Sequence, residues 1–222
     1  DGEIGQTAVK LLNRLGYQVI VPEIGISGRT YLSKGMLIKA REIAEKNIAD
    51  FIKTIPADKV LIGIEPSAIL SFRDEYPDLC RGDLKEKAMG IAKRTFLIEE
   101  FLAKELEEGR ISSSSFTEKE ERVRMHGHCF QKALSSVVPL KKILMLPNNY
   151  TVLNIPSGCC GMAGSFGYEK EHYDISMKIG ELVLFPSIRS ENEATLISAS
   201  GTSCRHQIAD GTNRKAEHTK NI

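Results

Sequence analysis

Four cysteines in the second half of this 222-residue chain have the residue type and spacing of a metal-ligating set. They follow the pattern C-x29-C-C-x43-C, and the central pair lies in a glycine-rich stretch over residues 155–167. Thiolates are the ligands that iron–sulfur clusters and soft metals prefer. The spacing matches neither the usual ferredoxin pattern nor the zinc-finger pattern, so a cluster and a tetrahedral zinc ion both stay open. The candidate ligands are Cys129, Cys159, Cys160 and Cys204.

The elements around these cysteines are predicted to bring them to one edge of a sheet. Three segments are predicted to be strands: 121–128, 151–155 and 195–200. Helices are expected over 129–134, 139–146 and about 168–188, and again after Cys204. Cys129, Cys160 and Cys204 each follow one of the strands. Because open α/β sheets carry their sites at the carboxyl ends of parallel strands, the four sulfurs are expected to converge there.

The first half shows the same alternation of strands and helices. Its predicted helices cover 3–15, 33–55, a short segment after 65–68, and 83–108, and its predicted strands cover 17–22 and 59–64. Residues 108–117 form the one linker-like stretch, which suggests two domains, 1–110 and 111–222. The pattern predicts an α/β fold of two pseudo-repeated halves, with short and mostly parallel sheets flanked by helices.

The two halves resemble each other at their turns. Two pairs of turns align at offsets of 133 and 136 positions: 24–28 with 157–161, and 65–68 with 201–204. The cysteines of the second-half turns are replaced in the first half by Ile26, Ser27 and Ala68. The same offset places the counterpart of Cys129, and of the strand before it, ahead of residue 1. We therefore expect a duplicated architecture whose first half lacks a thiolate site and acts as a scaffold or docking surface.

Composition and charge narrow the class of protein. The net charge of +1 gives no reason to expect nucleic acid as a partner, and no apolar run approaches the roughly 18 residues of a membrane span. Five cysteines without a secretion signal favour reduced thiols in the cytoplasm over a disulfide framework. Cys80 has no cysteine near it in the sequence and is expected to be structural. The chain opens at Asp1 on what resembles a helix start, which suggests a fragment of a longer protein.

Several other polar residues lie near the cysteines. His126 and His128 immediately precede Cys129, so a mixed Cys/His site is an alternative, although local hydrogen bonding is the favoured interpretation. Arg205 follows Cys204 and is expected either to stabilise a thiolate site or to be a surface charge. The remaining histidines are predicted to be solvated: His172, His206 and His218.

At these motifs the sequence resembles the CCG-type cysteine-rich domains found in heterodisulfide reductases and in related iron–sulfur proteins. It is most similar to the C-terminal iron–sulfur region of FAD-linked glycolate and D-lactate oxidases. The resemblance covers essentially the whole chain, and the second-half glycine-rich stretch is its most specific part. The matching segments are HGHC (126–129), SGCCGMAGSFGY (157–168), SGTSCRHQI (200–208), GRTYLSKG (28–35) and EPS (65–67).

The resemblance implies a function for the intact protein and a role for this chain. A flavin domain carrying FAD would oxidise a 2-hydroxy acid of the D-lactate or glycolate type. This module would pass the electrons to an acceptor, in the cytoplasm or at the inner face of the membrane, and would not be a complete enzyme by itself. A 4Fe–4S cluster, which an isolated fragment can lose or exchange for zinc, would be ligated by Cys129, Cys159, Cys160 and Cys204.

The chain departs from the family pattern at several positions. The last element is commonly C-x-x-C, but Gly201 occupies its first place, which argues against an unusual non-cubane cluster. Phe130 replaces a frequent histidine. The first-half cysteines of related chains are absent, since this chain has Ile26, Ser27 and Ala68 there.

Three other interpretations of the cysteines remain. The first is a zinc site that organises partners without redox activity, and the second is an interaction domain with free thiols. A thiol/disulfide oxidoreductase that uses the adjacent Cys159 and Cys160 is the least favoured, because neighbouring cysteines form a strained disulfide and no C-x-x-C motif is present.

Overall fold

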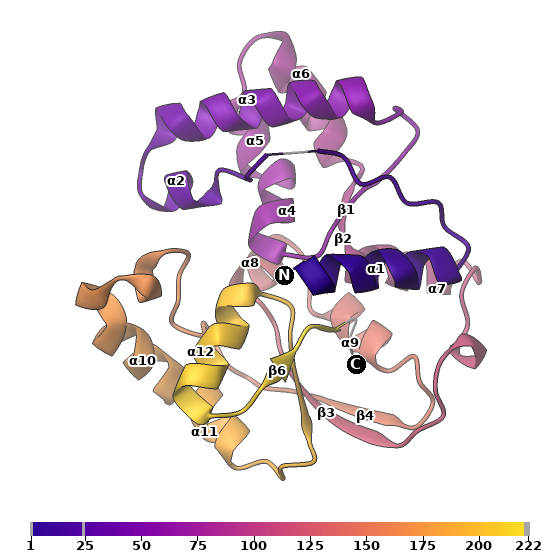
Figure 1. The fold of residues 1–222 in the computed structure, drawn as a ribbon, viewed down its shortest axis with the longest axis vertical. Helices are drawn as coiled ribbons and strands as arrows, with labels where there is room; N and C mark the ends of the chain where they lie inside the picture. Colours follow the sequence, from indigo (N-terminus) through magenta and orange to yellow (C-terminus); the bar gives the residue numbers. More distant parts are fainter. Residues whose placement is uncertain (1, 24, 220–222) are drawn as a thin grey trace.

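The computed structural model describes residues 2–23 and 25–219 and has an α/β fold with two short parallel sheets (Figure 1). The helices are α1 Gly2–Arg14, α2 Arg29–Ser33, α3 Leu37–Thr54, α4 Pro66–Arg73, α5 Glu75–Leu79, α6 Asp83–Ala92, α7 Ile98–Glu107, α8 Cys129–Leu134, α9 Val138–Leu144, α10 Tyr173–Leu182, α11 Leu184–Arg189 and α12 Thr202–Thr212. The strands are β1 Leu61–Gly63, β2 Thr95–Leu97, β3 Glu121–His126, β4 Tyr150–Asn154, β5 Leu196–Ala199 and β6 Ala216–Glu217. Short 3-10 turns are η1 Ser113–Ser115, η2 Phe166–Tyr168 and η3 Lys170–His172.

The larger sheet belongs to the second half and has the strand order β4-β3-β5-β6, with all pairs parallel. Its central strand β3 pairs on both sides, so that Val123 lies between Val152 of β4 and Leu196 of β5. Val123 and Met125 are buried against α9 and β4 because a central strand covered on its faces favours apolar residues. This topology places three turns, those after β3, β4 and β5, at one edge of the sheet.

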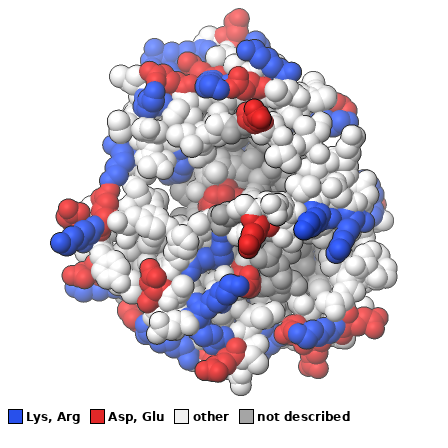
Figure 2. Space-filling view, in the orientation of Figure 1, with Lys and Arg blue, Asp and Glu red and all other residues white. Residues whose placement is uncertain are grey.

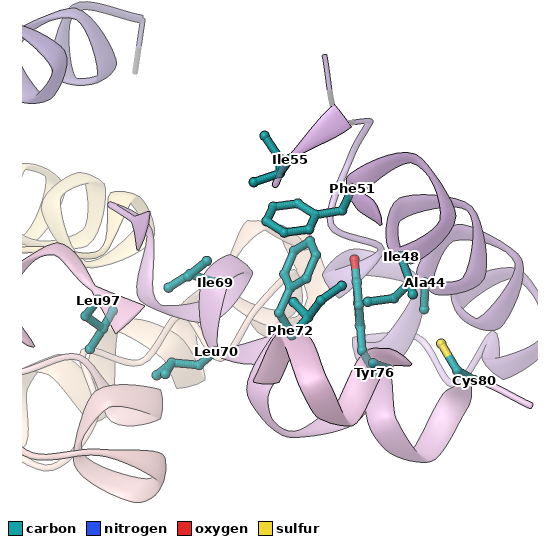
Figure 3. Close-up of a cluster of buried hydrophobic side chains, with 12 residues drawn as sticks. Ala44, Ile48, Phe51, Ile55, Ile69, Leu70, Phe72, Tyr76, Cys80 and Leu97 are labelled. Atoms are coloured by element: carbon teal, nitrogen blue, oxygen red, sulfur yellow. The ribbon is translucent and has the colours of Figure 1, made fainter. Parts of the chain in front are cut away.

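The first half contains a sheet of two parallel strands, β1 and β2, packed against helices. Its largest apolar cluster lies between α3, α4 and α5, where Phe51, Phe72 and Tyr76 meet (Figure 3). The rings of Phe72 and Tyr76 have centroids 4.4 Å apart. Cys80 is buried in the same cluster, as predicted, and burial raises its pKa to about 11. This cysteine is therefore a protonated structural thiol near neutral pH.

The predicted fold class is confirmed. One sheet lies before residue 110 and the other after residue 111, but the division of the chain into two domains there stays a prediction. A third apolar cluster joins the halves: it contains Ala8 and Leu12 of α1, Ile98 and Leu102 of α7, and Ile111 and Leu146. Within the described ranges, no helix is both long enough and apolar enough to cross a bilayer.

Two predicted elements of the first half are wrong in their boundaries. Ser33 ends α2 and does not cap α3, because Gly35 adopts a φ of +71° that interrupts the helix before Leu37. The helix predicted over 83–108 is two helices separated by β2, since Thr95–Leu97 pairs with β1 and the Glu100 carboxylate accepts the Leu97 N–H at 2.9 Å. Pairing with a distant strand here overrides the local helical pattern.

Two further predictions are corrected. The strand predicted over 17–22 is outside any sheet among the described residues. The helix predicted over 168–188 starts only at Tyr173 and breaks at Val183, because Pro186 lacks the N–H that would bond the carbonyl of Leu182. The short strand β6, which pairs with β5 and extends the sheet, was not predicted from the sequence.

Glu99, at the start of α7, connects the two halves. Its side chain is buried, and Ser200 Oγ donates a hydrogen bond to Glu99 Oε1 at 2.7 Å. Burial is the main cause that raises the pKa of Glu99, while the hydrogen bond from Ser200 acts in the opposite direction. The folded protein therefore favours the protonated carboxyl more than the unfolded chain does.

We expect the replacement Glu99→Gln to remove a pH-dependent loss of stability. When folding raises the pKa of a carboxyl, that carboxyl stabilises the folded protein fully at a pH below its unfolded pKa of about 4.3. This stabilisation is lost as the pH rises through the folded pKa. Urea unfolding between pH 4 and pH 8 should show wild type losing free energy of unfolding relative to Glu99→Gln as pH increases. Parallel curves for the two proteins would contradict a raised pKa.

Candidate metal centre

The three turns at the carboxyl edge of the larger sheet carry all four candidate cysteines. Cys129 is the first residue of α8, directly after β3 and its two-residue connection. Cys159 and Cys160 follow β4, whose ladder is extended by a hydrogen bond from Ile155 N to Met125 O at 2.9 Å. Cys204 lies in the first turn of α12, after β5. The sequence prediction that the strand ends converge here agrees with this placement.

The four cysteines affect one another's pKa in series: Cys129 with Cys159, Cys159 with Cys160, and Cys160 with Cys204. Cys160 and Cys204 are only 3% and 2% exposed, while Cys129 and Cys159 are half-buried. The cluster of sulfurs therefore has a closed side, at Cys160 and Cys204, and a side nearer to solvent.

The side chain of His126 points to the closed side of this group. A ring nitrogen of His126 and the sulfurs of Cys160 and Cys204 all lie within 4.8 Å of one another. His126 Nδ1 is hydrogen-bonded to Ser157 Oγ at 2.7 Å, which leaves Nε2 buried without a protein partner among the described residues. Since buried polar atoms are rarely left without a partner, the centre itself is the natural partner of Nε2.

His128 has a different role from His126. It is buried, and its Nδ1 accepts a hydrogen bond from the backbone N–H of Phe130 at 3.1 Å, which caps α8. The favoured prediction of local hydrogen bonding is confirmed for His128. For His126, local bonding to Ser157 accounts for one ring nitrogen only, so the mixed Cys/His alternative gains support there.

The glycine-rich turn after β4 directs backbone N–H groups at Cys159. Gly161 adopts a φ of +106° and donates its N–H to Cys159 Sγ at 3.3 Å, and Ala163 in the same turn has a φ of +40°. The neighbouring Cys129 lowers the pKa of Cys159 most, and the backbone groups of Gly161 and Ala163 lower it further. The turn thus stabilises a thiolate at this position.

The four thiols influence one another's protonation. Cys159 raises the pKa of Cys129, and Cys159 and Cys204 raise that of Cys160. Cys160 lowers the pKa of Cys204. Metal and cluster ligation uses cysteine in its thiolate form, so four cysteines on neighbouring turns fit a thiolate-ligated metal or cluster.

A side chain at position 201 would crowd this edge. A Cβ at Gly201 would lie 2.3 Å from His128 Cδ2 and 3.3 Å from Cys204 Sγ. Any larger residue here would require His128 to move.

Two charged residues hold the helix that carries Cys204. Glu65 Oε2 accepts hydrogen bonds from the N–H and the Oγ1 of Thr202, at 2.8 and 3.0 Å, while Glu65 Oε1 accepts from Ser67. The half-buried Arg205 donates to the carbonyls of Ala199 and Ser200 at 3.1 and 2.6 Å. One first-half carboxylate thus caps both α4 and α12. Arg205 fixes the turn before Cys204, and its electrostatic interaction with Cys204 is in keeping with the predicted stabilisation of a thiolate site.

We expect Glu65→Ala to lower the free energy of unfolding by about 2 kcal/mol, because two helix N-termini lose their side-chain acceptor. Denaturant unfolding monitored by circular dichroism measures this loss. Glu65→Gln is the control: its side chain has the same length and keeps one acceptor oxygen, so its free energy of unfolding should fall less. Equal stability of the alanine variant and wild type would show that Thr202 finds another cap.

In the first half, the turn that corresponds to the double cysteine is occupied by other contacts. Tyr76 Oη donates to Ser27 O at 2.8 Å, and Asn47 Nδ2 donates to Ile26 O at 2.9 Å. Next to it, the Arg29 guanidinium stacks on the Phe130 ring of α8, 4.3 Å from its centroid. The first half therefore contacts the helix that begins with Cys129, which agrees with the predicted scaffold role.

The predictions for the other histidines are mixed. His206 is exposed and hydrogen-bonds to Tyr168 Oη at 3.0 Å, and His172 is half-exposed beside Glu169. The prediction for His218 is wrong: it is 1% exposed, and its Nε2 lies 2.9 Å from the carbonyl of Ile64. No local pattern near His218 indicates this burial, because its partner is 154 positions away.

The candidate centre is therefore a sulfur-rich site at the carboxyl edge of a parallel α/β sheet. Comparisons with known proteins show that the chain is similar to parts of redox enzymes. The chain is 28% identical over 205 residues to D-2-hydroxyglutarate dehydrogenase of Pantoea ananatis, across 90% of this chain and 19% of that protein. It is 27% identical over 220 residues to a subunit of the anaerobic glycerol-3-phosphate dehydrogenase of Escherichia coli, across 97% of this chain and 53% of that polypeptide. It is 25% identical over 223 residues to lactate utilization protein A of Bacillus subtilis, across 98% and 88%.

The similarity to these relatives supports the general assignment of this chain as a module of an oxidoreductase. The chain spans about a fifth of the first relative and about half of the second. No protein-family model matches the sequence, and no solved structure matches it significantly.

Proposed function

We propose that this chain is an iron–sulfur electron-transfer module of an FAD-linked oxidoreductase. Its 4Fe–4S cluster is held by Cys129, Cys159, Cys160 and Cys204. The observation that carries the proposal is the placement of all four cysteines on the three turns that follow the parallel strands β3, β4 and β5, at the carboxyl edge of the sheet. The reduced thiols that this ligation needs suit the cytoplasm, or the cytoplasmic face of a membrane.

The protein's own residues give this site the properties of an electron-transfer centre. A bound cluster supplies a one-electron redox couple. Backbone N–H groups of the glycine-rich turn donate to Cys159, and such hydrogen bonds tune the potential of a cluster. The buried Cys160 and Cys204 exclude water on one side, while the half-buried Cys129 and Cys159 form the side that a redox partner can approach.

The remainder of the reaction is proposed from the relatives. Two of them are dehydrogenases of D-2-hydroxyglutarate and glycerol-3-phosphate by name, and the third is named for lactate utilization. An oxidase that removes a hydride from a 2-hydroxy acid needs a two-electron carrier, which FAD provides. The iron–sulfur module would take electrons one at a time from that flavin domain and deliver them to an acceptor.

The decisive experiment is metal analysis on protein purified without oxygen. About four irons and four inorganic sulfides per chain, with a broad visible absorption that bleaches on reduction, are expected for the proposed cluster. Absence of iron and sulfide after anaerobic purification and after chemical reconstitution would overturn the proposal.

A second candidate, a structural zinc site, is favoured by one observation. The ring nitrogen of His126 and the sulfurs of Cys160 and Cys204 lie within 4.8 Å of one another, a compact set of the ligand types that zinc prefers. One zinc ion per chain without visible absorption, retained after reconstitution with iron and sulfide, would establish this alternative.

A further inference from the structure

His126, the last residue of β3, has its side chain on the face of the sheet that carries the buried cysteines. Side chains alternate along a strand, and the neighbouring Met125 packs with α9 and β4 on the opposite face. His126 is paired in the sheet with Ala199 of β5, which belongs to the same buried apolar cluster as Cys160 and Cys204. His126 is 1% exposed. Its ring therefore lies inside the protein, beside the closed side of the centre.

Three elements fix the orientation of this ring. Its Nδ1 lies 2.7 Å from Ser157 Oγ, in the turn after β4. The backbone of that turn is held by Lys132 of α8, whose Nζ donates to the carbonyl of Ser157 at 2.8 Å and to the carbonyl of Gly158. A strand, a turn and a helix thus fix Nδ1, and Nε2 is the ring nitrogen that remains available to the centre.

The hydroxyl of Ser157 determines which ring nitrogen carries the proton. Ser157 is buried, and among the described residues His126 Nδ1 is the one hydrogen-bond partner of its Oγ. If this hydroxyl accepted a hydrogen bond from Nδ1, its own O–H would be left without an acceptor. Donation from Ser157 Oγ to Nδ1 satisfies the hydroxyl and leaves the proton of the neutral ring on Nε2.

The sulfurs of Cys160 and Cys204 are the acceptors that suit this donor. Both cysteines are buried, and their sulfurs and a ring nitrogen of His126 lie within 4.8 Å of one another. His126 Nε2 itself is buried without a protein partner in the part of the chain that the structure describes. In an interior of low dielectric, a hydrogen bond to a charged acceptor is stronger than at the surface.

The surface charges of the protein have less influence on the centre than this buried donor. Figure 2 shows Lys and Arg interspersed with Asp and Glu on the face that it presents. The net charge is only +1. The fields of interspersed charges largely cancel at a distance, and salt screens what remains. The hydrogen bonds made inside the site therefore have the larger effect on its reduction potential.

We propose that His126 donates a hydrogen bond from Nε2 to the sulfurs of the centre and thereby raises its reduction potential, and that Ser157 is the positioning residue that keeps the proton on Nε2. This inference rests on the proposed function, because it concerns the cluster held by the four cysteines. Four cysteines supply one ligand for each iron of a 4Fe–4S cluster, so His126 is a neutral donor and not a further ligand. A donor to sulfur stabilises the more negative, reduced state most, which raises the potential.

Redox titration of the reconstituted full chain tests the inference. We expect His126→Leu, which has no donor, to bind about four irons per chain, as the wild type does, and to have a lower potential. At a fixed potential, the ratio of reduced to oxidised cluster should fall at least about tenfold, which corresponds to about 59 mV for one electron. Ser157→Ala should shift the potential in the same direction by less, because the ring then populates both tautomers.

His172→Leu is the matched control. It makes the same chemical change at a half-exposed histidine that lies beside Glu169. Its potential and its iron content should equal those of the wild type. Thermal unfolding of all variants shows whether each protein is folded.

Isotope-labelled histidine separates a hydrogen-bond donor from a ligand. Pulsed electron paramagnetic resonance of the reduced wild-type protein should show a weak nitrogen coupling and an exchangeable proton close to the cluster. Both signals should be lost in His126→Leu. A strong nitrogen coupling in the wild type, together with loss of iron in His126→Leu, would make His126 a ligand and would overturn the inference.

Two other outcomes would overturn it while the wild type retains its cluster. The first is a wild-type potential in folded His126→Leu or, if that variant does not fold, in Ser157→Ala, which removes a single oxygen atom. The second is an equal shift in His172→Leu, because replacement of a distant histidine would then have the same effect. Wild-type protein without iron and sulfide after reconstitution would instead overturn the proposed function, and this inference with it.

Discussion

Cys160→Ser is expected to abolish cluster binding, with iron falling from about four per chain to less than one after anaerobic reconstitution. Cys159 and Cys204 both affect the pKa of Cys160, which is 3% exposed, so Cys160 is the middle member of the group. A serine hydroxyl stays protonated near neutral pH and is a poor ligand for iron in a cluster. Iron and sulfide analysis, with the visible spectrum, measures the loss.

Cys80→Ser provides the matched control for this variant. Cys80 is also a buried cysteine, but it lies in the apolar cluster of the first half with its pKa raised to about 11. The same chemical change there should lower stability while leaving iron content unchanged. Full iron content in a folded Cys160→Ser protein would exclude Cys160 as a ligand, and loss of iron in both variants would point to a general folding defect.

The location of the centre follows from the sequence because one rule of fold geometry is enough to predict it. Each of Cys129, Cys160 and Cys204 comes shortly after a predicted strand, and parallel strands end at the same edge. The strands in question are local patterns of four to six residues, which sequence reasoning recognises well. The alternation of strands and helices indicated the parallel topology in the same way.

The supports of the centre could not be predicted, since they are contacts between residues far apart in the chain. Glu65 caps Thr202 across 137 positions, and Ser200 bonds Glu99 across 101. The role of His126 was only half predictable: its position before Cys129 is visible in the sequence, but the burial of its Nε2 is not. Short elements such as β2 and β6 were missed because distant pairing partners determine them.

The first-half turn over residues 26–28 is held by contacts that do not involve thiols. Its backbone carbonyls are bonded by Tyr76 and Asn47, and the adjacent Arg29 stacks on Phe130 of α8. Arg29 is also paired with Glu75 at 2.8 Å, which fixes its guanidinium plane. The first half thus holds the helix that begins at Cys129, while Glu65 holds the helix of Cys204. Two of the candidate ligands are oriented by the half that has none.

Gly161→Ala is expected to destabilise the protein by about 3 kcal/mol or more and to prevent cluster binding. The φ of +106° at Gly161 is strained for any residue with a Cβ, and a Cβ there would lie 2.1 Å from the backbone oxygen of Ser176 in α10. Strain and overpacking each cost about 1 to 3 kcal/mol. The turn cannot relieve the clash by a side-chain rotation, because the obstructing atom belongs to the backbone of a helix.

The same turn contains the control for this prediction. A Cβ on Gly158 meets no atom within 4 Å, and its φ lies outside the left-handed region, so Gly158→Ala should leave stability and iron content close to wild type. Denaturant unfolding and iron analysis of the two variants separate the effects. If Gly161→Ala were as stable as Gly158→Ala, the turn would have another accessible conformation, and the N–H of Gly161 would not be needed to hold the Cys159 sulfur in place.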